Sequence, residues 1–200
     1  MTGPALGTLG FIVGTLLNLY AMVVALRFVM QTLRADYYNP IAQFVVKATD
    51  PLLVPMRRVI PSLGGLDTSS LLLAFAVLLL KLLAFKLLGL GAAPAIGTAL
   101  NVAVIPLPVM AYLAAVDLLY VLFNIFIFAI FIQALMSWLP NSGSNPMTGL
   151  LERITSPVLT PVRRIIPPLG GLDLSAMVAL IGLYALRMFI VGVLLGFAGG

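Results

Sequence analysis

The side chains of this sequence that can carry charge or bind a metal are few. Its 200 residues include eleven Lys and Arg, six Asp and Glu, and no His or Cys. Without His the usual general base near neutral pH is missing, and without Cys neither disulfides nor thiolate metal sites can form. We therefore expect no catalytic site, no metal site and no cofactor, and we predict that the protein is not an enzyme.

Two cations interrupt long apolar segments. Lys81 lies twelve residues beyond Ser69, which is about 18 Å along a helix, and Arg187 occupies a similar place near the end of the chain. An ionised side chain at mid-bilayer costs several kcal/mol unless it faces a cavity or a polar partner. We predict an intramembrane polar site made of Lys81, Arg187, Asn18 and Asn124, in which neither cation has an acidic partner.

The alternative is that a lysine extends its aliphatic stem toward the membrane surface. This interpretation suits Lys86, nearer the outer end of its segment, better than Lys81. Asp117 is the only acid in the apolar segments, and we expect it to pair with Lys86.

Two arginine pairs occur in polar stretches of the sequence. Near a membrane, each basic residue gains roughly 1 kcal/mol from the anionic leaflet, so the pairs are candidate sites for anionic lipid or for a partner. The alternative is that they only fix the topology, or pair with nearby aspartates. The four residues are Arg57, Arg58, Arg163 and Arg164.

The composition places these side chains in a membrane protein. The sequence is 62% hydrophobic and 8% charged, with a mean hydropathy of +1.18, whereas soluble domains are roughly a quarter charged. A bilayer-spanning helix needs about 20 apolar residues. We predict an all-α membrane protein with four transmembrane helices, at about 6–33, 69–90, 109–139 and 174–197.

The segment 91–108 is apolar but contains Pro94, Pro106 and Pro108. It is too short to span, so we expect an extracytoplasmic connector that is interfacial or re-entrant. Seven of the eleven basic residues lie in 34–68 and 140–173. The positive-inside rule then predicts that both of these loops are cytoplasmic and that both termini are periplasmic.

The sequence repeats itself at an offset of 106 residues. Positions 39–69 and 145–175 are identical at 16 of 31 places, and the offset also relates Asn18 to Asn124 and Lys81 to Arg187. Each unit reads as span, amphipathic loop, span, which makes the repeats parallel. We divide the chain into a first repeat at 1–90 and a second at 109–200.

Each loop carries the same local signals. An Asn-Pro pair starts a helix, and Ile41, Phe44, Val45 and Ala48 lie on one face of it, as in a helix on a membrane surface. A second Xaa-Pro, Asp50-Pro51 or Ser156-Pro157, predicts a new short helix. Gly-Gly then permits a left-handed turn, and Asp67 or Ser69 (Asp173 or Ser175 in the second repeat) caps the next span. These loop residues are Asn39, Pro40, Gly64, Gly65, Asp67, Asn145, Pro146, Gly170, Gly171 and Asp173.

The doubled motifs resemble those of the YggT family, also called YlmG. They are Tyr-Asn-Pro at 38–40 with its partner Asn-Pro, and Pro-Xaa-Arg-Arg-Xaa-Ile-Pro and Gly-Gly-Leu-Asp, each present twice. The resemblance covers nearly the whole chain and implies a multi-pass protein of the bacterial inner membrane. It also implies a link to osmotic-stress tolerance, with relatives linked to cell division, nucleoid distribution and plastid cytochrome assembly.

Two functions follow as expectations. The first is a non-enzymatic inner-membrane protein that supports osmotic-stress tolerance, or organises a membrane protein complex, through its paired basic loops. The alternative is a small channel or transporter subunit. Expected partners are anionic lipids and a membrane protein or a second copy, since Gly10 and Gly14 have the spacing of close helix packing. Seven loop cations without interleaved aromatics do not indicate a nucleic-acid partner.

Overall fold

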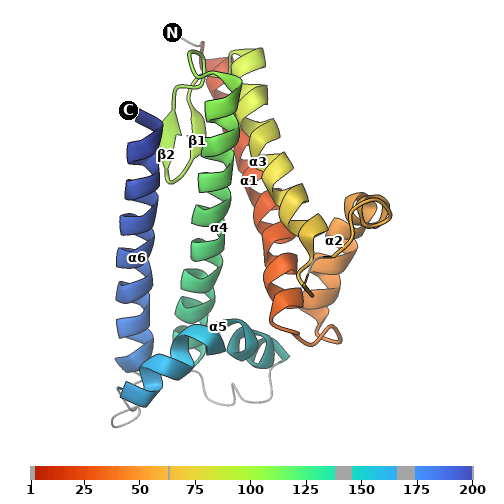
Figure 1. Cartoon of the computed structure of the whole chain (residues 1–200), viewed down its shortest axis with the longest axis vertical. Coiled ribbons are helices and arrows are strands. Elements are labelled where there is room, and N and C mark those ends of the chain that lie inside the picture. Colours follow the sequence, from red (N-terminus) through yellow and green to blue (C-terminus); the bar gives the residue numbers. More distant parts are fainter. Residues whose placement is uncertain (1–2, 63, 138–145, 166–173, 200) are drawn as a thin grey trace.

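The computed structural model describes residues 3–62, 64–137, 146–165 and 174–199. Four of its helices are long and apolar enough to cross a membrane, and they confirm the predicted spans. The elements are α1 (Pro4–Thr32), α2 (Pro40–Arg57), α3 (Thr68–Leu88), β1 (Ala93–Ala95), β2 (Thr98–Leu100), α4 (Leu107–Met136), α5 (Pro146–Ile165) and α6 (Leu174–Gly199) (Figure 1).

The helices pack as two equivalent units. In the first unit α1 packs along α3, with α2 against both, and in the second α4 packs along α6, with α5 against both. Helix α4 also contacts α1 and α3 and so joins the units. The start of α1, the end of α6 and the strands lie at one end of the molecule, and α2 and α5 lie toward the other (Figure 1).

The two loop helices are continuous, so the predicted restart at the second proline is wrong. Helix α2 runs through Pro51 and Pro55, and α5 runs through Pro157 and Pro161. All four prolines are exposed. In α2 the buried residues Ala42, Val45, Thr49 and Leu53 lie on both sides of Pro51. This packed inner face holds a single helix although proline removes a hydrogen bond.

The turn between α2 and α3 follows from side-chain caps and glycine. Asn39 Oδ1 accepts a hydrogen bond from Ile41 N (2.8 Å) at the start of α2, and Asp67 caps α3 by accepting from Ser70 N (3.3 Å). Gly64 and Gly65 have φ of +60° and +83°, the left-handed region that glycine enters at least cost. In the second repeat Pro146 begins α5, and Asn145, Gly170, Gly171 and Asp173 lie outside the described residues.

The connector is a two-stranded antiparallel hairpin, a structure that the apolar composition of 91–108 did not indicate. Ala95 pairs with Thr98 across a two-residue turn of Ile96 and Gly97, whose φ values are +55° and +72°. Two positive φ values in succession are the signature of a type I′ hairpin turn. The hairpin stands beside α1, α3 and α4 at the end of the bundle that carries the termini (Figure 1).

Gly10 and Gly14 make room for this connector. A Cβ on Gly10 would lie 2.8 Å from Leu90 O, and one on Gly14 would lie 2.7 Å from Pro94 Cγ. The Gly-Xaa3-Gly spacing therefore serves close packing within the chain. It gives no support to the expected packing of a second copy.

Candidate functional site

Lys81 lies inside the bundle with two side-chain partners. Its side chain is 0% exposed. The Nζ atom donates to Asn18 Oδ1 on α1 at 2.7 Å and to Asp117 Oδ2 on α4 at 2.6 Å. Lys81 therefore has an acidic partner, and the prediction of an unpaired cation at this position is wrong.

The predicted pairing of Asp117 with Lys86 is also wrong. Lys86 Nζ donates instead to the carbonyl of Ile105 at 2.5 Å. Asp117 lies ten residues into α4, about 15 Å from the helix start, and this depth brings it level with Lys81. The depth of each residue follows from its position along its span, but the faces on which α3 and α4 meet do not.

Arg187 has a different set of partners in the second repeat. Its guanidinium donates to Asn124 Oδ1 and lies over the rings of Tyr120 and Tyr184, 4.7 and 4.5 Å from their centroids. The contact with Asn124 repeats the contact of Lys81 with Asn18, as the 106-residue offset requires. Among the described residues, Lys81 forms an ion pair and Arg187 does not. Cation–π contacts with two rings replace the carboxylate.

Asp117 connects three elements. While Oδ2 accepts from Lys81, Oδ1 accepts from the backbone N–H of Ile96 at 2.7 Å, at the tip of the hairpin. The same turn rests on α4 at Gly97, where a Cβ would collide with the Tyr120 hydroxyl. One buried carboxylate thus neutralises a cation of the first repeat and anchors the connector onto the second.

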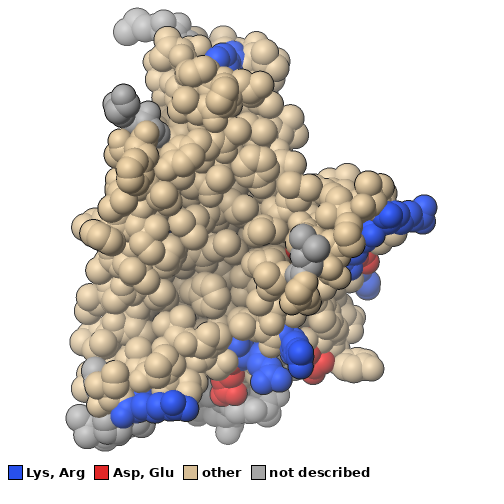
Figure 2. All heavy atoms as spheres, viewed as in Figure 1, with Lys and Arg blue, Asp and Glu red and all other residues tan. Residues whose placement is uncertain are grey.

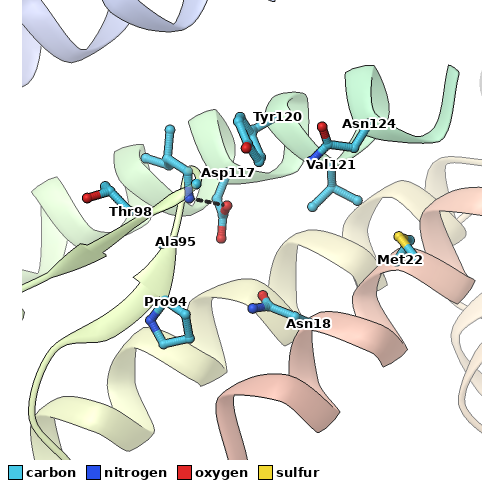
Figure 3. Close-up of a pocket in the computed structure, with 11 residues that line it drawn as sticks. Asn18, Met22, Pro94, Ala95, Thr98, Asp117, Tyr120, Val121 and Asn124 are labelled. Atoms are coloured by element: carbon cyan, nitrogen blue, oxygen red, sulfur yellow. Dashed lines mark hydrogen bonds between the residues drawn. The ribbon is translucent and has the colours of Figure 1, made fainter. Parts of the chain in front are cut away.

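A cavity of ≈ 390 Å³ lies beside this network. Asn18 projects into it from α1, Asp117, Tyr120 and Asn124 project from α4, and the hairpin forms a further wall (Figure 3). Met22, Pro94, Ala95 and Val121 supply apolar lining. Among the described residues, no group of three or more acidic side chains could hold a metal ion. The cavity offers amide, hydroxyl and carboxylate groups for binding a small molecule.

A second polar link, which the sequence interpretation missed, joins each loop helix to a span. Arg27 of α1 is 4% exposed and donates to Thr49 Oγ1 (2.6 Å) and to Val46 O (3.1 Å), and it forms an ion pair with Asp50 Oδ1 (2.7 Å). In the second repeat Thr155 donates to Gln133. The repeat offset maps Arg27 onto Gln133 and Thr49 onto Thr155. The alignment of the two repeats therefore already showed that both positions are polar in both repeats.

The arginine pairs divide into two roles. Arg57 donates to Asp67 and to Gln31 Oε1 (3.0 Å), so it holds the end of α2 against the start of α3. Burial by itself raises the pKa of Asp67, but the hydrogen bonds from Arg57 and Ser70 outweigh it and hold that pKa below its usual value. Arg58, Arg163 and Arg164 have exposed side chains.

Comparisons with known proteins agree with the repeat. A family model described as CCB3/YggT matches residues 6–88 and again 112–194. An uncharacterized protein of Pseudomonas aeruginosa is 40% identical over 94% of this chain and 91% of its own length. An uncharacterized protein of Vibrio alginolyticus is 36% identical over 96% and 97%. The uncharacterized protein YggT of Escherichia coli K12 is 34% identical over 94% and 92%. No solved structure matches the chain.

Proposed function

Because the chain belongs to the CCB3/YggT family, we propose that it is a non-enzymatic inner-membrane protein that supports osmotic-stress tolerance. In this proposal α2 and α5 lie on the cytoplasmic leaflet and bind anionic lipid, and a membrane protein complex assembles on the surface that they form. Both chain termini are then periplasmic.

A matched pair of residues in the two repeats carries the proposal. Arg58 is exposed and is followed by Val59, which is 81% exposed, and the equivalent Arg164 is followed by Ile165, which is 80% exposed. An arginine beside a bare aliphatic side chain suits the headgroup boundary, where the cation meets lipid phosphate and the alkyl group enters the acyl region. Since neither aliphatic residue packs on the protein, a role in folding does not explain them.

The distribution of charge supports the same surface. Lys and Arg gather over α2 and at the end of the molecule where α5 lies, while the long flank of the spans is almost bare of charge in this view (Figure 2). Near anionic lipid, each such cation is worth about 1 kcal/mol.

Lipid co-purification tests the proposal. Arg58→Gln combined with Arg164→Gln should lower the amount of phosphatidylglycerol and cardiolipin that co-purifies in mild detergent, with no change in thermal unfolding of the spans. Lys86→Gln removes one positive charge at the opposite end and should leave the lipid content unaltered. The proposed function predicts that the double variant also fails to rescue growth of a deletion strain at high osmolarity. If the double variant co-purifies with as much anionic lipid as the parent, the two arginines act only as topology signals.

A channel or transporter subunit is the second candidate, and the cavity between the repeats favours it. A space of ≈ 390 Å³ lined by Asn18, Asp117 and Asn124 places polar groups between the apolar helices, and polar groups inside a membrane commonly mark a solute path. Solute release from vesicles that contain the purified protein separates the candidates. The lipid-binding function predicts no release above that of protein-free vesicles.

A further inference from the structure

The cavity between the repeats presents hydrogen-bond donors because of the partners that its asparagines already have. A lysine ammonium and an arginine guanidinium can only donate. Lys81 therefore takes the Oδ1 atom of Asn18, and Arg187 takes the Oδ1 atom of Asn124. Each amide is left with its NH₂ group, and no hydrogen bond among the described residues uses either nitrogen.

The carboxylate of Asp117 also lines the cavity, but it is held by the protein, and the hydroxyls of Thr98 and Tyr120 can donate as well as accept. Each oxygen of the Asp117 carboxylate already accepts a hydrogen bond, Oδ2 from Lys81 and Oδ1 from Ile96 N. Figure 3 shows Asn18 on α1 across the space from Asn124 on α4, with Asp117 further along α4 on the same side as Asn124. A molecule that enters this space meets two amide donors from two different helices.

The charge balance favours an anion. Lys81, Arg187 and Asp117 together carry a formal charge of +1, and one Asp cannot neutralise both cations. An unbalanced positive charge within the membrane is costly, and a bound monoanion would remove it. The two cations act through the amides, since a cation on the carbonyl oxygen polarises the amide and strengthens its N–H donors.

The size of the cavity favours an organic anion over a halide. The volume of ≈ 390 Å³ is more than ten times the share of one water molecule in the liquid, about 30 Å³, and lies within the range of small-molecule pockets. Met22, Pro94 and Val121 add apolar lining to the same cavity, so the ligand has an apolar body beside its charged group.

We propose that this cavity binds a small organic carboxylate, whose oxygens accept hydrogen bonds from Asn18 Nδ2 and Asn124 Nδ2. The site is distinct from the lipid-binding surface of α2 and α5, and its existence does not depend on that function.

Substitution of asparagine by the isosteric aspartate tests whether carboxylate binding needs the Nδ2 donors or only a polar side chain. Asn18→Asp and Asn124→Asp keep an oxygen for Lys81 or Arg187 but replace the NH₂ donor by a second acceptor. Binding of radiolabelled acetate and benzoate to the full chain in detergent is measured by equilibrium dialysis, with sodium chloride and acetamide as competitors. Each single variant should weaken carboxylate binding about tenfold or more, because a hydrogen bond to a charged group is lost and repulsion is added. Asn101→Asp, the same change outside the cavity, should bind as the parent does.

The proposed site is supported if carboxylate binding is saturable and is displaced only poorly by chloride and acetamide. Each Asn→Asp variant should also weaken this binding. Absence of carboxylate binding by the parent chain overturns the proposal, as does equal binding by the variants and the parent. Chloride that competes as well as benzoate would assign the cavity to halides. Thermal unfolding of each variant shows that the protein measured is folded, and the competition series on the parent chain tests ligand class without any substitution.

Discussion

Lys81 and Asp117 form a buried ion pair whose members come from different repeats. The exposed fractions of the two side chains are 0% and 4%, so neither charge is screened by solvent. Removal of one member of such a pair leaves an uncompensated charge, whereas removal of both can be close to neutral. The pair therefore acts as a unit, and its members should be exchanged together.

We predict that Lys81→Leu lowers the free energy of unfolding by about 3 kcal/mol, since it leaves Asp117 charged and buried. Lys81→Leu combined with Asp117→Asn should recover most of the loss, because asparagine is neutral and still accepts from Ile96 N. Denaturant unfolding in detergent micelles, followed by circular dichroism, measures both. A double variant as unstable as Lys81→Leu would contradict this account of the pair.

The pair of Arg57 and Asp67 makes stability depend on acid pH. Hydrogen bonds hold the pKa of Asp67 below its ordinary value of 3.8, so the folded state binds its proton less readily than the unfolded chain. The resulting stabilisation is present above 3.8 and is lost as the pH falls through the lowered folded-state pKa. When the free energy of unfolding is measured as the pH falls below 3.8, Asp67→Asn should lose less stability than the parent protein. Parallel curves for the two proteins would exclude the link.

Each loop helix depends on its span for its position. Along its length, helix α2 is held by Arg27 of α1, which bonds to Thr49 and Asp50. At its end, it is held by the ion pair of Arg57 with Asp67. In the second repeat Gln133 and Thr155 take the place of the first link. These contacts, together with the packed inner face, explain why two prolines do not divide the helix.

The hairpin depends on the absence of a side chain at Gly14. We predict that Gly14→Ala destabilises the protein by about 1–3 kcal/mol, the usual range for overpacking, because its Cβ would lie 2.7 Å from Pro94 Cγ and 3.1 Å from Phe85. Gly7→Ala is the matched control in the same helix, where a Cβ meets nothing within 4 Å, and it should be neutral or stabilising. Thermal unfolding of the two variants is the measurement, and equal midpoints would show that the hairpin can move aside.

The two halves of the molecule are similar but not interchangeable. Asn18 with Lys81 and Asn124 with Arg187 occupy equivalent places. The position equivalent to Asp117 is Phe11, which is 73% exposed, so the carboxylate that crosses between the repeats has no counterpart. The cavity and the hairpin anchor thus arise at a contact between the halves that has no equivalent at Phe11.

Single cysteines can fix the orientation, because the sequence has none of its own. We predict that Asn101→Cys, beyond the hairpin, reacts with a membrane-impermeant maleimide in intact spheroplasts. Ser62→Cys, between α2 and α3, should react only in inverted vesicles. The reason is the excess of Lys and Arg in the loops 34–68 and 140–173. Labelling of Ser62→Cys from outside would reverse the topology.

The sequence by itself determined the membrane class, the four spans, the two repeats and the caps at Asn39 and Asp67. These depend on apolar length, on identity at a fixed offset and on contacts a few residues apart, all of which are local or periodic. It also marked Asn18, Lys81, Asn124 and Arg187 as a set, because the repeat doubled them.

Only the tertiary structure decided which groups meet. The pairing of Lys81 with Asp117, the anchoring of Ile96, the position of Gly14 under Pro94 and the cavity all depend on how α3 and the hairpin face α4. Helix rotation about its own axis is set by packing between elements distant in the chain. Apolar spans that are hydrophobic on every side carry no periodic pattern that indicates the inward face.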